Sequence, residues 1–161
     1  MADRETRSII VKADAQTAYS VWANFEDFPR FMEHIESVRK TGPHTSHWVM
    51  GGPLGKKLEW DAETTRLEAN KRIAWNSKDG GGLTTSGEAL FNPLPRGETE
   101  ITVTLQYVPP AGLAGEIVSD LFAHPGKMLE QDLRNFKAYV EGLAAPLNEG
   151  RSGPGQIAGS P

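Results

Sequence analysis

The sequence contains no cysteine, which excludes disulfide bonds, thiolate metal ligands and a cysteine nucleophile. It also lacks any apolar run near the ~20 residues that a membrane-spanning helix needs, and residues 1–7 are mostly charged or polar. Neither sign of charge is in large excess: 17 basic and 21 acidic residues give a net charge of -4, which argues against a phosphate-backbone binder. We therefore expect a cytoplasmic protein that does not bind nucleic acid directly and whose membrane contacts, where they occur, are transient.

The 161 residues suit one folded domain with a polar tail. Residues 147–161 are rich in Gly, Ser and Pro and offer little apolar surface to offset the entropy of ordering them. We expect a domain over 1–146 and a flexible tail over 147–161. A chain of this size can bury a hydrophobic core without a metal or a covalent staple.

The first part of the chain predicts a strand followed by two short helices. Residues 6–12 are rich in β-branched side chains, and Asp14 is placed to cap a helix whose apolar residues recur at helical spacing over 15–25. A second helical spacing covers 28–35 around Pro29, since proline is tolerated in the first turn of a helix.

Further along, the apolar period changes to two and then returns to the helical value. Strands are expected at 37–41, 44–51, 57–67, 72–77, 83–91 and 98–108. Two helical stripes follow, at 113–121 and 129–143, with Pro125 predicting a break near His124. A long amphipathic helix after an antiparallel sheet must bury its stripe on the apolar face of that sheet, which gives an α+β fold.

Several short segments carry a resemblance to a known superfamily. They are 18–22 (AYSVW), 25–31 (FEDFPRF), 59–63 (EWDAE), 73–75 (IAW), 86–91 (SGEALF) and 132–137 (DLRNFK). Together they resemble the START / birch-pollen-allergen-like (SRPBCC) superfamily, in its bacterial polyketide cyclase/dehydrase or coenzyme Q-binding START-like branch. The resemblance implies a helix-grip fold, in which a curved seven-stranded antiparallel sheet wraps around a long C-terminal helix and two short helices follow the first strand.

The resemblance also implies an apolar cavity between the sheet and the C-terminal helix, in which relatives bind lipids, sterols, isoprenoid quinones or polyketide intermediates. Trp48, Trp60 and Trp75 occupy three successive predicted strands, and three large rings on one face either fill a core or line a pocket. Trp22 belongs to a helical stripe and is expected in the core. Residues 111–126 are the candidate lid. The candidate ligand-binding residues are Trp48, Met50, Trp60, Trp75, Phe91, Val103, Leu105, Leu121, Leu129, Leu133 and Phe136.

Other polar patterns favour structural roles. Glu59, Asp61 and Glu63 alternate on the face opposite Trp60 and predict a solvated outer surface. His44 and His47 lack the spacing of a metal site, so neither a metal nor a cofactor is expected.

The sequence predicts a protein that binds a small hydrophobic ligand such as a lipid, an isoprenoid or quinone, or a polyketide-like molecule. The alternative is a polyketide cyclase/aromatase-type enzyme that acts in the same cavity. For that chemistry the only candidates are weak, namely His124, which Asp120 could orient from one helical turn away, and Tyr107. A third interpretation is a role with a macromolecular partner, in which the tryptophans fill the cavity. The patterns predict no oligomeric state.

Overall fold

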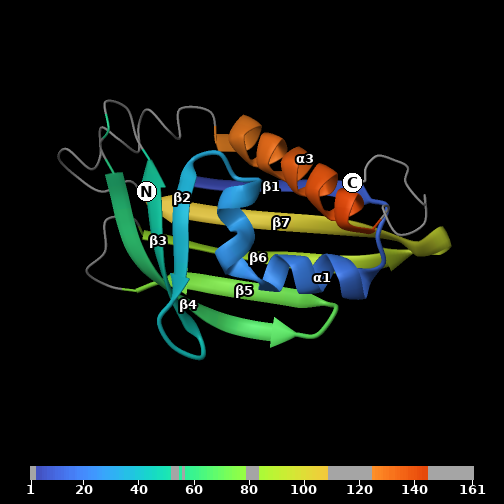
Figure 1. Cartoon of the computed structure of the whole chain (residues 1–161), viewed down its shortest axis with the longest axis horizontal. Coiled ribbons are helices and arrows are strands. Elements are labelled where there is room, and N and C mark those ends of the chain that lie inside the picture. The colour runs from blue at the N-terminus through green and yellow to red at the C-terminus, as the bar shows by residue number, and fades with distance from the viewer. Residues whose placement is uncertain (1–2, 52–54, 56, 79–83, 109–124, 145–161) are drawn as a thin grey trace.

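The computed structural model describes residues 3–51, 55, 57–78, 84–108 and 125–144. Seven strands form one antiparallel sheet, as the resemblance implied, and their order in the sheet is β1-β7-β6-β5-β4-β3-β2 (Figure 1). The strands are β1 (Asp3–Val11), β2 (Ile35–Lys40), β3 (Thr45–Gly51), β4 (Lys57–Glu68), β5 (Arg72–Ser77), β6 (Thr84–Leu94) and β7 (Glu98–Val108). Short 3-10 turns, η1 (Phe25–Arg30) and η3 (Pro95–Gly97), interrupt the chain.

The connections explain why the sheet has this order. From β2 to β7 each strand pairs with the next, whereas β1 pairs with the last strand, β7, with Ile9 opposite Ile101. The helix α1 (Ala15–Ala23) and the turn η1 carry the chain from β1 at one edge to β2 at the other. These two elements are the short helices expected after the first strand.

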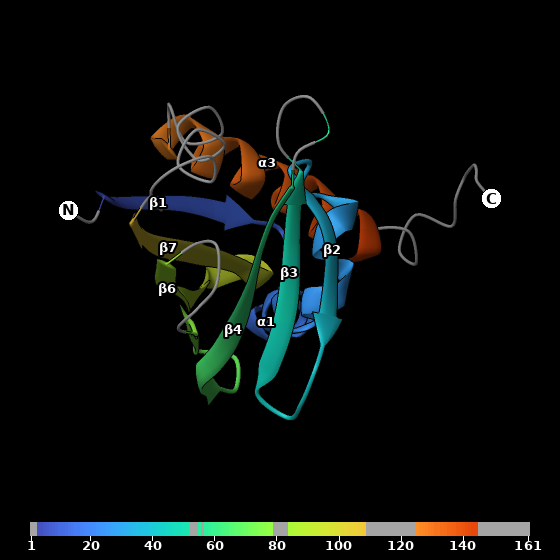
Figure 2. The ribbon, with the colours of Figure 1, turned by 90° about the vertical axis from the view of Figure 1, so that its left-hand side faces the viewer.

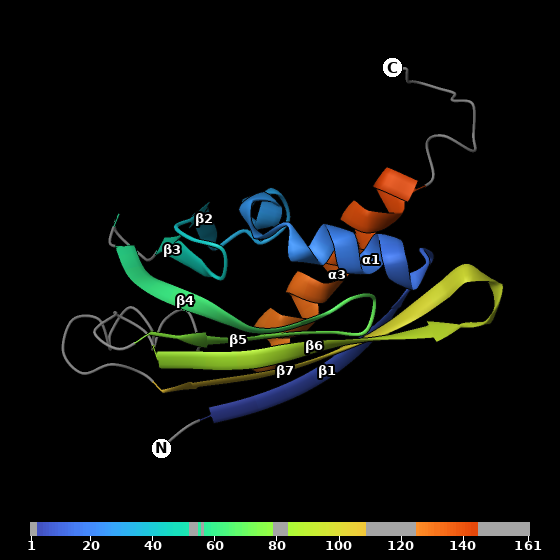
Figure 3. The same cartoon turned by 90° about the horizontal axis from the view of Figure 1, so that it is seen from below.

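The sheet is curved, and α1, η1 and α3 lie on its concave face, called here the inner face. Figure 2 shows β2, β3 and β4 side by side at the strongly bent end of the sheet. In Figure 3, β4 curves away from β5, so that β3 and β2 rise to the level of α1 and α3 (Pro125–Ala144). This arrangement is the helix-grip fold.

Local sequence signals account for the helix ends. The Asp14 side chain accepts a hydrogen bond from the Thr17 backbone N–H at 2.8 Å, so the predicted cap of α1 is confirmed. Pro125 is the first residue of α3, where its missing N–H costs no helical hydrogen bond. The stripe at 113–121 and the candidate lid up to His124 lie outside the described residues.

The second short helix is present, but it is the 3-10 helix η1 over Phe25–Arg30 and does not extend over 28–35. Ile35 begins β2, opposite Met50 of β3. Phe28, Phe31 and Ile35 are all buried in the same core, although they belong to different elements. Their spacing therefore reflects burial in one core, and it does not indicate a continuous helix.

A cluster of buried aromatic rings joins α1, η1 and α3 in the core. Phe136 of α3 is fully buried, and its ring lies 5.0 Å from that of Trp22 and 5.4 Å from that of Phe31, in edge-to-face contacts. At the next residue of α3, Lys137 Nζ donates a hydrogen bond of 3.0 Å to the Ile10 carbonyl oxygen and so links the helix to the edge strand β1. None of the described helices is long and apolar enough to cross a lipid bilayer.

Candidate functional site

Beside this core, the inner face of the sheet borders a cavity of about 130 Å³. Among the described residues, its wall is almost entirely apolar and receives side chains from α1, η1, α3 and six of the strands. The lining residues among those described are Trp22, Phe25, Phe28, Met32, His34, Ile35, Ser46, Trp48, Met50, Trp60, Ala62, Thr64, Trp75, Thr85, Val103, Leu105, Met128, Leu129 and Asp132.

Two paired tryptophans form the sheet side of this wall. Trp48 and Trp60 lie directly opposite each other on β3 and β4, with their rings stacked at 6.0 Å and an interplanar angle of 14°. The Trp48 indole N–H donates to Ser46 Oγ at 2.8 Å, so this ring presents its carbon surface to the cavity with its polar atom already bonded. The stack gives the cavity a broad aromatic surface.

A glycine makes room for the third tryptophan. Gly87 of β6 lies opposite Trp75 of β5, and a Cβ atom at Gly87 would lie 2.6 Å from Trp75 Cζ2 and 2.7 Å from the Thr104 carbonyl oxygen. The missing side chain therefore allows the Trp75 indole to lie over β6 at the edge of the cavity. A larger residue at position 87 would displace that ring.

The helix α3 contributes Asp132 to the described lining of the cavity. Met128, Leu129 and Asp132 share a face of α3, since residues three and four apart project in the same direction. Burial, reinforced by the nearby charge of Glu33, raises the pKa of Asp132 from 3.8 to about 7. At neutral pH this carboxyl group is therefore divided between its protonated and ionised forms.

Trp22 has a buried polar atom that lacks a hydrogen-bond partner among the described residues. Its side chain is 3% exposed, and its Nε1–H meets no hydrogen-bond acceptor among the described residues. The ring packs against the apolar rings of Phe28, Phe91 and Phe136 and also borders the cavity. A buried donor of this kind is costly unless something accepts from it.

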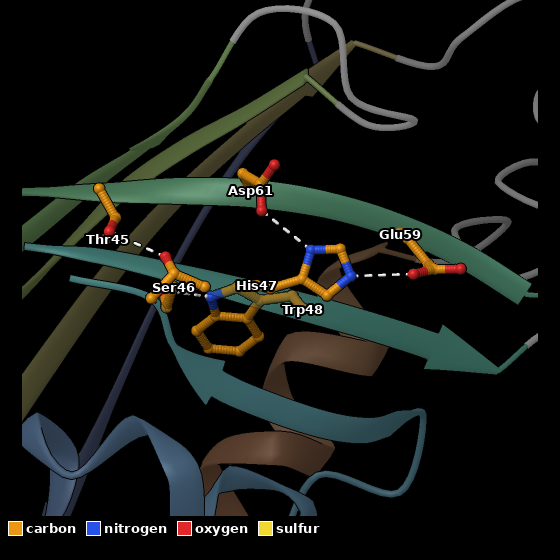
Figure 4. A network of polar contacts seen from close by, with 7 residues as sticks. Thr45, Ser46, His47, Trp48, Glu59 and Asp61 are labelled. Atoms are coloured by element: carbon orange, nitrogen blue, oxygen red, sulfur yellow. Dashed lines mark hydrogen bonds and ion pairs between the residues drawn. The ribbon is translucent and has the colours of Figure 1, made fainter.

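The opposite, outer face of the same strands is polar and internally bonded. His47 of β3 lies between two carboxylates of β4: its Nδ1 is 2.9 Å from Asp61 Oδ1 and its Nε2 is 2.8 Å from Glu59 Oε1 (Figure 4). These hydrogen bonds raise the pKa of His47 above its usual value. In the described part of the chain no group of side chains is suited to hold a metal ion.

Comparison with known proteins places this architecture in a family. The model of the family described as "Polyketide cyclase / dehydrase and lipid transport" matches residues 11–134, most of the chain. The chain belongs to that family. An uncharacterised 17.2 kDa protein of Streptomyces lincolnensis is 31% identical over 134 residues, which cover 83% of this chain and 87% of that protein. The family predicted from the sequence is thus confirmed.

Solved structures agree on the fold of this family member. A crystal structure from Deinococcus radiodurans has 33% sequence identity and a TM-score of 0.69, and the match covers 86% of this chain and 97% of that one. The Zhui aromatase/cyclase from a Streptomyces species has 18% identity and a TM-score of 0.74, with 92% and 99% covered. A START superfamily protein from Mycobacterium smegmatis has 19% identity and a TM-score of 0.71, with 87% and 98% covered.

The predicted site residues of this family member fall into three groups. Trp48, Met50, Trp60, Trp75, Val103, Leu105 and Leu129 line the cavity. Phe91, Leu133 and Phe136 are buried in the packed core beside the cavity and do not border it. Leu121 and His124 lie outside the described residues, as does the side chain of Tyr107, whose backbone belongs to β7 opposite Thr85.

Sequence reasoning does not single out Asp132 or the indole N–H of Trp22. In the sequence, Asp132 belongs to the segment 132–137 that carries the resemblance, and Trp22 belongs to a helical stripe expected in the core. A signal for Asp132 was present, because it lies three residues after Leu129 and four before Phe136, on the edge of the apolar stripe. No sequence signal shows that the N–H of Trp22 lacks an acceptor, because this depends on which rings surround it.

Proposed function

We propose that this protein binds a small hydrophobic ligand in the cavity between the sheet and α3. The observation that carries the proposal is the apolar cavity wall, which includes the stacked pair of Trp48 and Trp60 from the sheet and Met128 and Leu129 from α3. Burial of the ligand's apolar surface supplies the main driving force. The membership of a family described by polyketide chemistry and lipid transport supports the same function.

The size of the cavity indicates the scale of the ligand part that it holds. Its volume of about 130 Å³ is close to that of engineered apolar cavities, of roughly 150 Å³, that bind benzene. Lipids, isoprenoid or quinone rings and polyketide-like molecules all contain an apolar part of this size. A single-ring hydrocarbon is therefore a suitable probe.

The test is a calorimetric titration of ethylbenzene into the wild-type chain and two alanine variants. Ala62 lines the cavity, so Ala62→Leu fills it, whereas Ala138 is exposed on α3 and Ala138→Leu leaves the cavity unchanged. We expect Ala62→Leu to weaken binding at least about tenfold, because the ligand loses the space that it occupies. Ala138→Leu should bind like the wild type. Equal binding by all three chains would contradict the proposed site.

A second candidate function, an enzyme of the cyclase type in the same cavity, is favoured by one observation. Asp132 borders the apolar cavity with a pKa of about 7, which suits a general acid or base near neutral pH. This residue is a stronger candidate than His124 or Tyr107, which lie outside the described side chains.

Mass spectrometry separates this enzyme from a carrier. An enzyme that cyclises and dehydrates its ligand would release a product lighter by one water and would lose this activity in Asp132→Asn. A carrier would release the molecule that it took up.

A further inference from the structure

The charged side chains of the cavity wall narrow the class of ligand that it can hold. This step rests on the proposed function, because it concerns the same cavity. Of the described residues that line the cavity, Asp132 alone has an acidic side chain, and none is a lysine or an arginine. His34 is the only other titratable side chain of that lining. The described wall therefore offers a carboxyl group to a ligand and no permanently positive group.

Asp132 has no cationic partner within the part of the chain that the structure describes. The ion pairs formed there involve other residues; Glu130, two residues earlier on α3, pairs with Arg7 of β1. The charge that acts on Asp132 is that of Glu33, which is also negative. Such a carboxylate is costly to ionise, because a charge withdrawn from water needs a counter-charge. A cationic group of a ligand would supply it.

The segment between η1 and β2 passes close to Asp132. The Asn135 side chain, three residues further along α3, donates a hydrogen bond of 2.9 Å to the Phe31 carbonyl oxygen. Glu33 and His34 lie shortly after Phe31 in the chain. Both His34 and Asp132 line the cavity, and both are half-buried. On this side the wall of the cavity is therefore polar and partly open to water.

The rest of the wall suits an apolar body attached to a charged end. Leu129, one turn before Asp132 on α3, is buried and lines the cavity. Six of the described lining residues are aromatic, among them the stacked Trp48 and Trp60, and the faces of aromatic rings attract cations. A ligand can therefore bury its apolar part while its charged end stays at the half-exposed Asp132 and is only partly dehydrated.

The possible charges of a ligand's end differ in what they do at this carboxyl group. A carboxylate or phosphate is repelled by Asp132 and Glu33 and meets no lysine or arginine in the described wall. A neutral hydrocarbon end leaves the carboxyl group unpaired. An ammonium group can pair with the ionised form of Asp132 and donate charge-assisted hydrogen bonds to its oxygens.

We infer that the ligand of this cavity is an apolar amine whose ammonium group pairs with Asp132 while its apolar body lies among the aromatic side chains. Asp132 is then a residue that determines specificity. The inference predicts a preference for positive over negative ligands that burial of apolar surface alone does not produce.

The test compares three ligands that share one apolar body. They are ethylbenzene, 2-phenylethylamine, which adds an ammonium group to it, and 3-phenylpropanoate, which adds a carboxylate. Calorimetric titrations of the full-length chain are made at pH 8, where a primary alkylamine, like a lysine side chain, keeps its proton. We expect the amine to bind at least about tenfold more tightly than the carboxylate, because Asp132 attracts one and repels the other. Ala62→Leu should weaken binding of the amine as it weakens binding of ethylbenzene.

Asp132→Asn assigns this preference to one residue. The variant removes the negative charge at nearly constant size and should reduce the preference for the amine over the carboxylate to within about threefold. Ethylbenzene should bind to it at least as tightly as to the wild type. The matched control is Glu130→Gln, which removes one negative charge from the same helix, since Glu130 pairs with Arg7 and is not among the described lining residues. This control should keep the wild-type preference.

The affinity for the amine should also depend on pH. Only the ionised form of Asp132 attracts an ammonium group, and its pKa of about 7 places the change between pH 5.5 and 8. The wild type should bind the amine at least about threefold more tightly at pH 8 than at pH 5.5, and Asp132→Asn should lose most of this rise. Glu33 and His34 are the other titratable groups beside Asp132. A rise that persists in Asp132→Asn would therefore contradict the role of Asp132.

The outcomes separate this inference from the proposed function. If ethylbenzene binds and the amine binds no more tightly than the carboxylate, the amine site is wrong while the hydrophobic cavity stands. A preference that Asp132→Asn leaves unchanged, or that Glu130→Gln also removes, leads to the same conclusion, because the charge of the whole chain would then explain it. If none of the three probes binds, both proposals are wrong.

Discussion

Polar groups on the two sides of the sheet differ in their hydrogen-bond partners. On the outer face, His47 of β3 has both ring nitrogens bonded, to Asp61 and Glu59. On the inner side, the buried indole N–H of Trp22 in α1 has no partner among the described residues, and the half-buried Asp132 of α3 borders the cavity with a raised pKa. Leaving a buried donor unpaired costs roughly 1–3 kcal/mol. The comparison indicates that the bonded polar groups of the outer face contribute to stability, whereas these inner groups reduce it.

The largest effect is expected where the inner face is fully packed. Phe136→Ala should lower the free energy of unfolding by about 3–5 kcal/mol, because the ring is completely buried and its loss leaves a cavity. Urea denaturation measures this change. On the outer face, Ser8→Ala removes an exposed hydrogen bond to Thr102 and should cost less than about 1 kcal/mol. Similar losses for both variants would remove the distinction between the faces.

The cavity end of the inner face should behave differently, because Asp132 destabilises the folded chain when it is ionised. Its pKa is raised from 3.8 to about 7, so the folded state holds the proton more tightly than the unfolded state. Stability should therefore fall as pH rises from about 4 to 7, by up to about 4 kcal/mol for a shift of this size, and stay level above that range.

Asp132→Asn tests this pH dependence. The variant removes the titrating carboxyl group that lies among Glu33, His34 and the apolar wall. It should be more stable than the wild type at pH 8, with the difference shrinking toward pH 4, as measured by denaturation at each pH. A difference that does not change with pH would show that ionisation of Asp132 is not the cause.

A substitution at Gly87 tests the position of the Trp75 ring in the cavity wall. Gly87→Ala places a Cβ atom against Trp75 and the Thr104 carbonyl oxygen and should cost about 1–3 kcal/mol through overpacking. It should also weaken ethylbenzene binding, since the displaced indole borders the cavity. The matched control is Gly142→Ala in α3, where a Cβ meets nothing within 4 Å and helix propensity predicts a gain of up to about 1 kcal/mol. Thermal melts distinguish the opposite signs.

The smallest effect is expected for the histidine of the outer face. The pKa of His47 is raised by its bonds to Asp61 and Glu59, so its contribution is complete below pH 6.5 and is lost as pH rises through the raised value. His47→Gln should cost about 0.5–1 kcal/mol at pH 5.5, the range of a partly exposed ion pair, and close to nothing at pH 9. A loss of stability in His47→Gln that grows as pH rises would contradict this pH dependence.

Much of this fold could be predicted from the sequence, because strand alternation and helix capping are local. The alternation of Trp48 and Trp60 against His47, Glu59 and Asp61 correctly separates the two faces of the sheet. The predicted extent of the second helix differs from the structure for a physical reason. Phe28 of η1 and Ile35 of β2 are buried in one core although they belong to different elements. Spacing alone does not distinguish such a surface from a helix.

Less of the candidate site than of the fold could be predicted from the sequence. Apolar residues such as Phe91 and Phe136 have the same pattern whether they fill the core or line a cavity, and only their packing decides. The importance of Asp132 arises from burial and from Glu33, a residue distant in sequence. The orphaned N–H of Trp22 arises from three surrounding rings.

Native mass spectrometry of the protein purified from its own host tests the central claim, that the cavity holds a hydrophobic ligand, most directly. The wild-type chain and Ala138→Leu should retain an apolar adduct of one defined mass, and Ala62→Leu should lose it because the added side chain occupies the cavity. A wild-type chain that is consistently bare, or an adduct that survives in Ala62→Leu, would contradict the account.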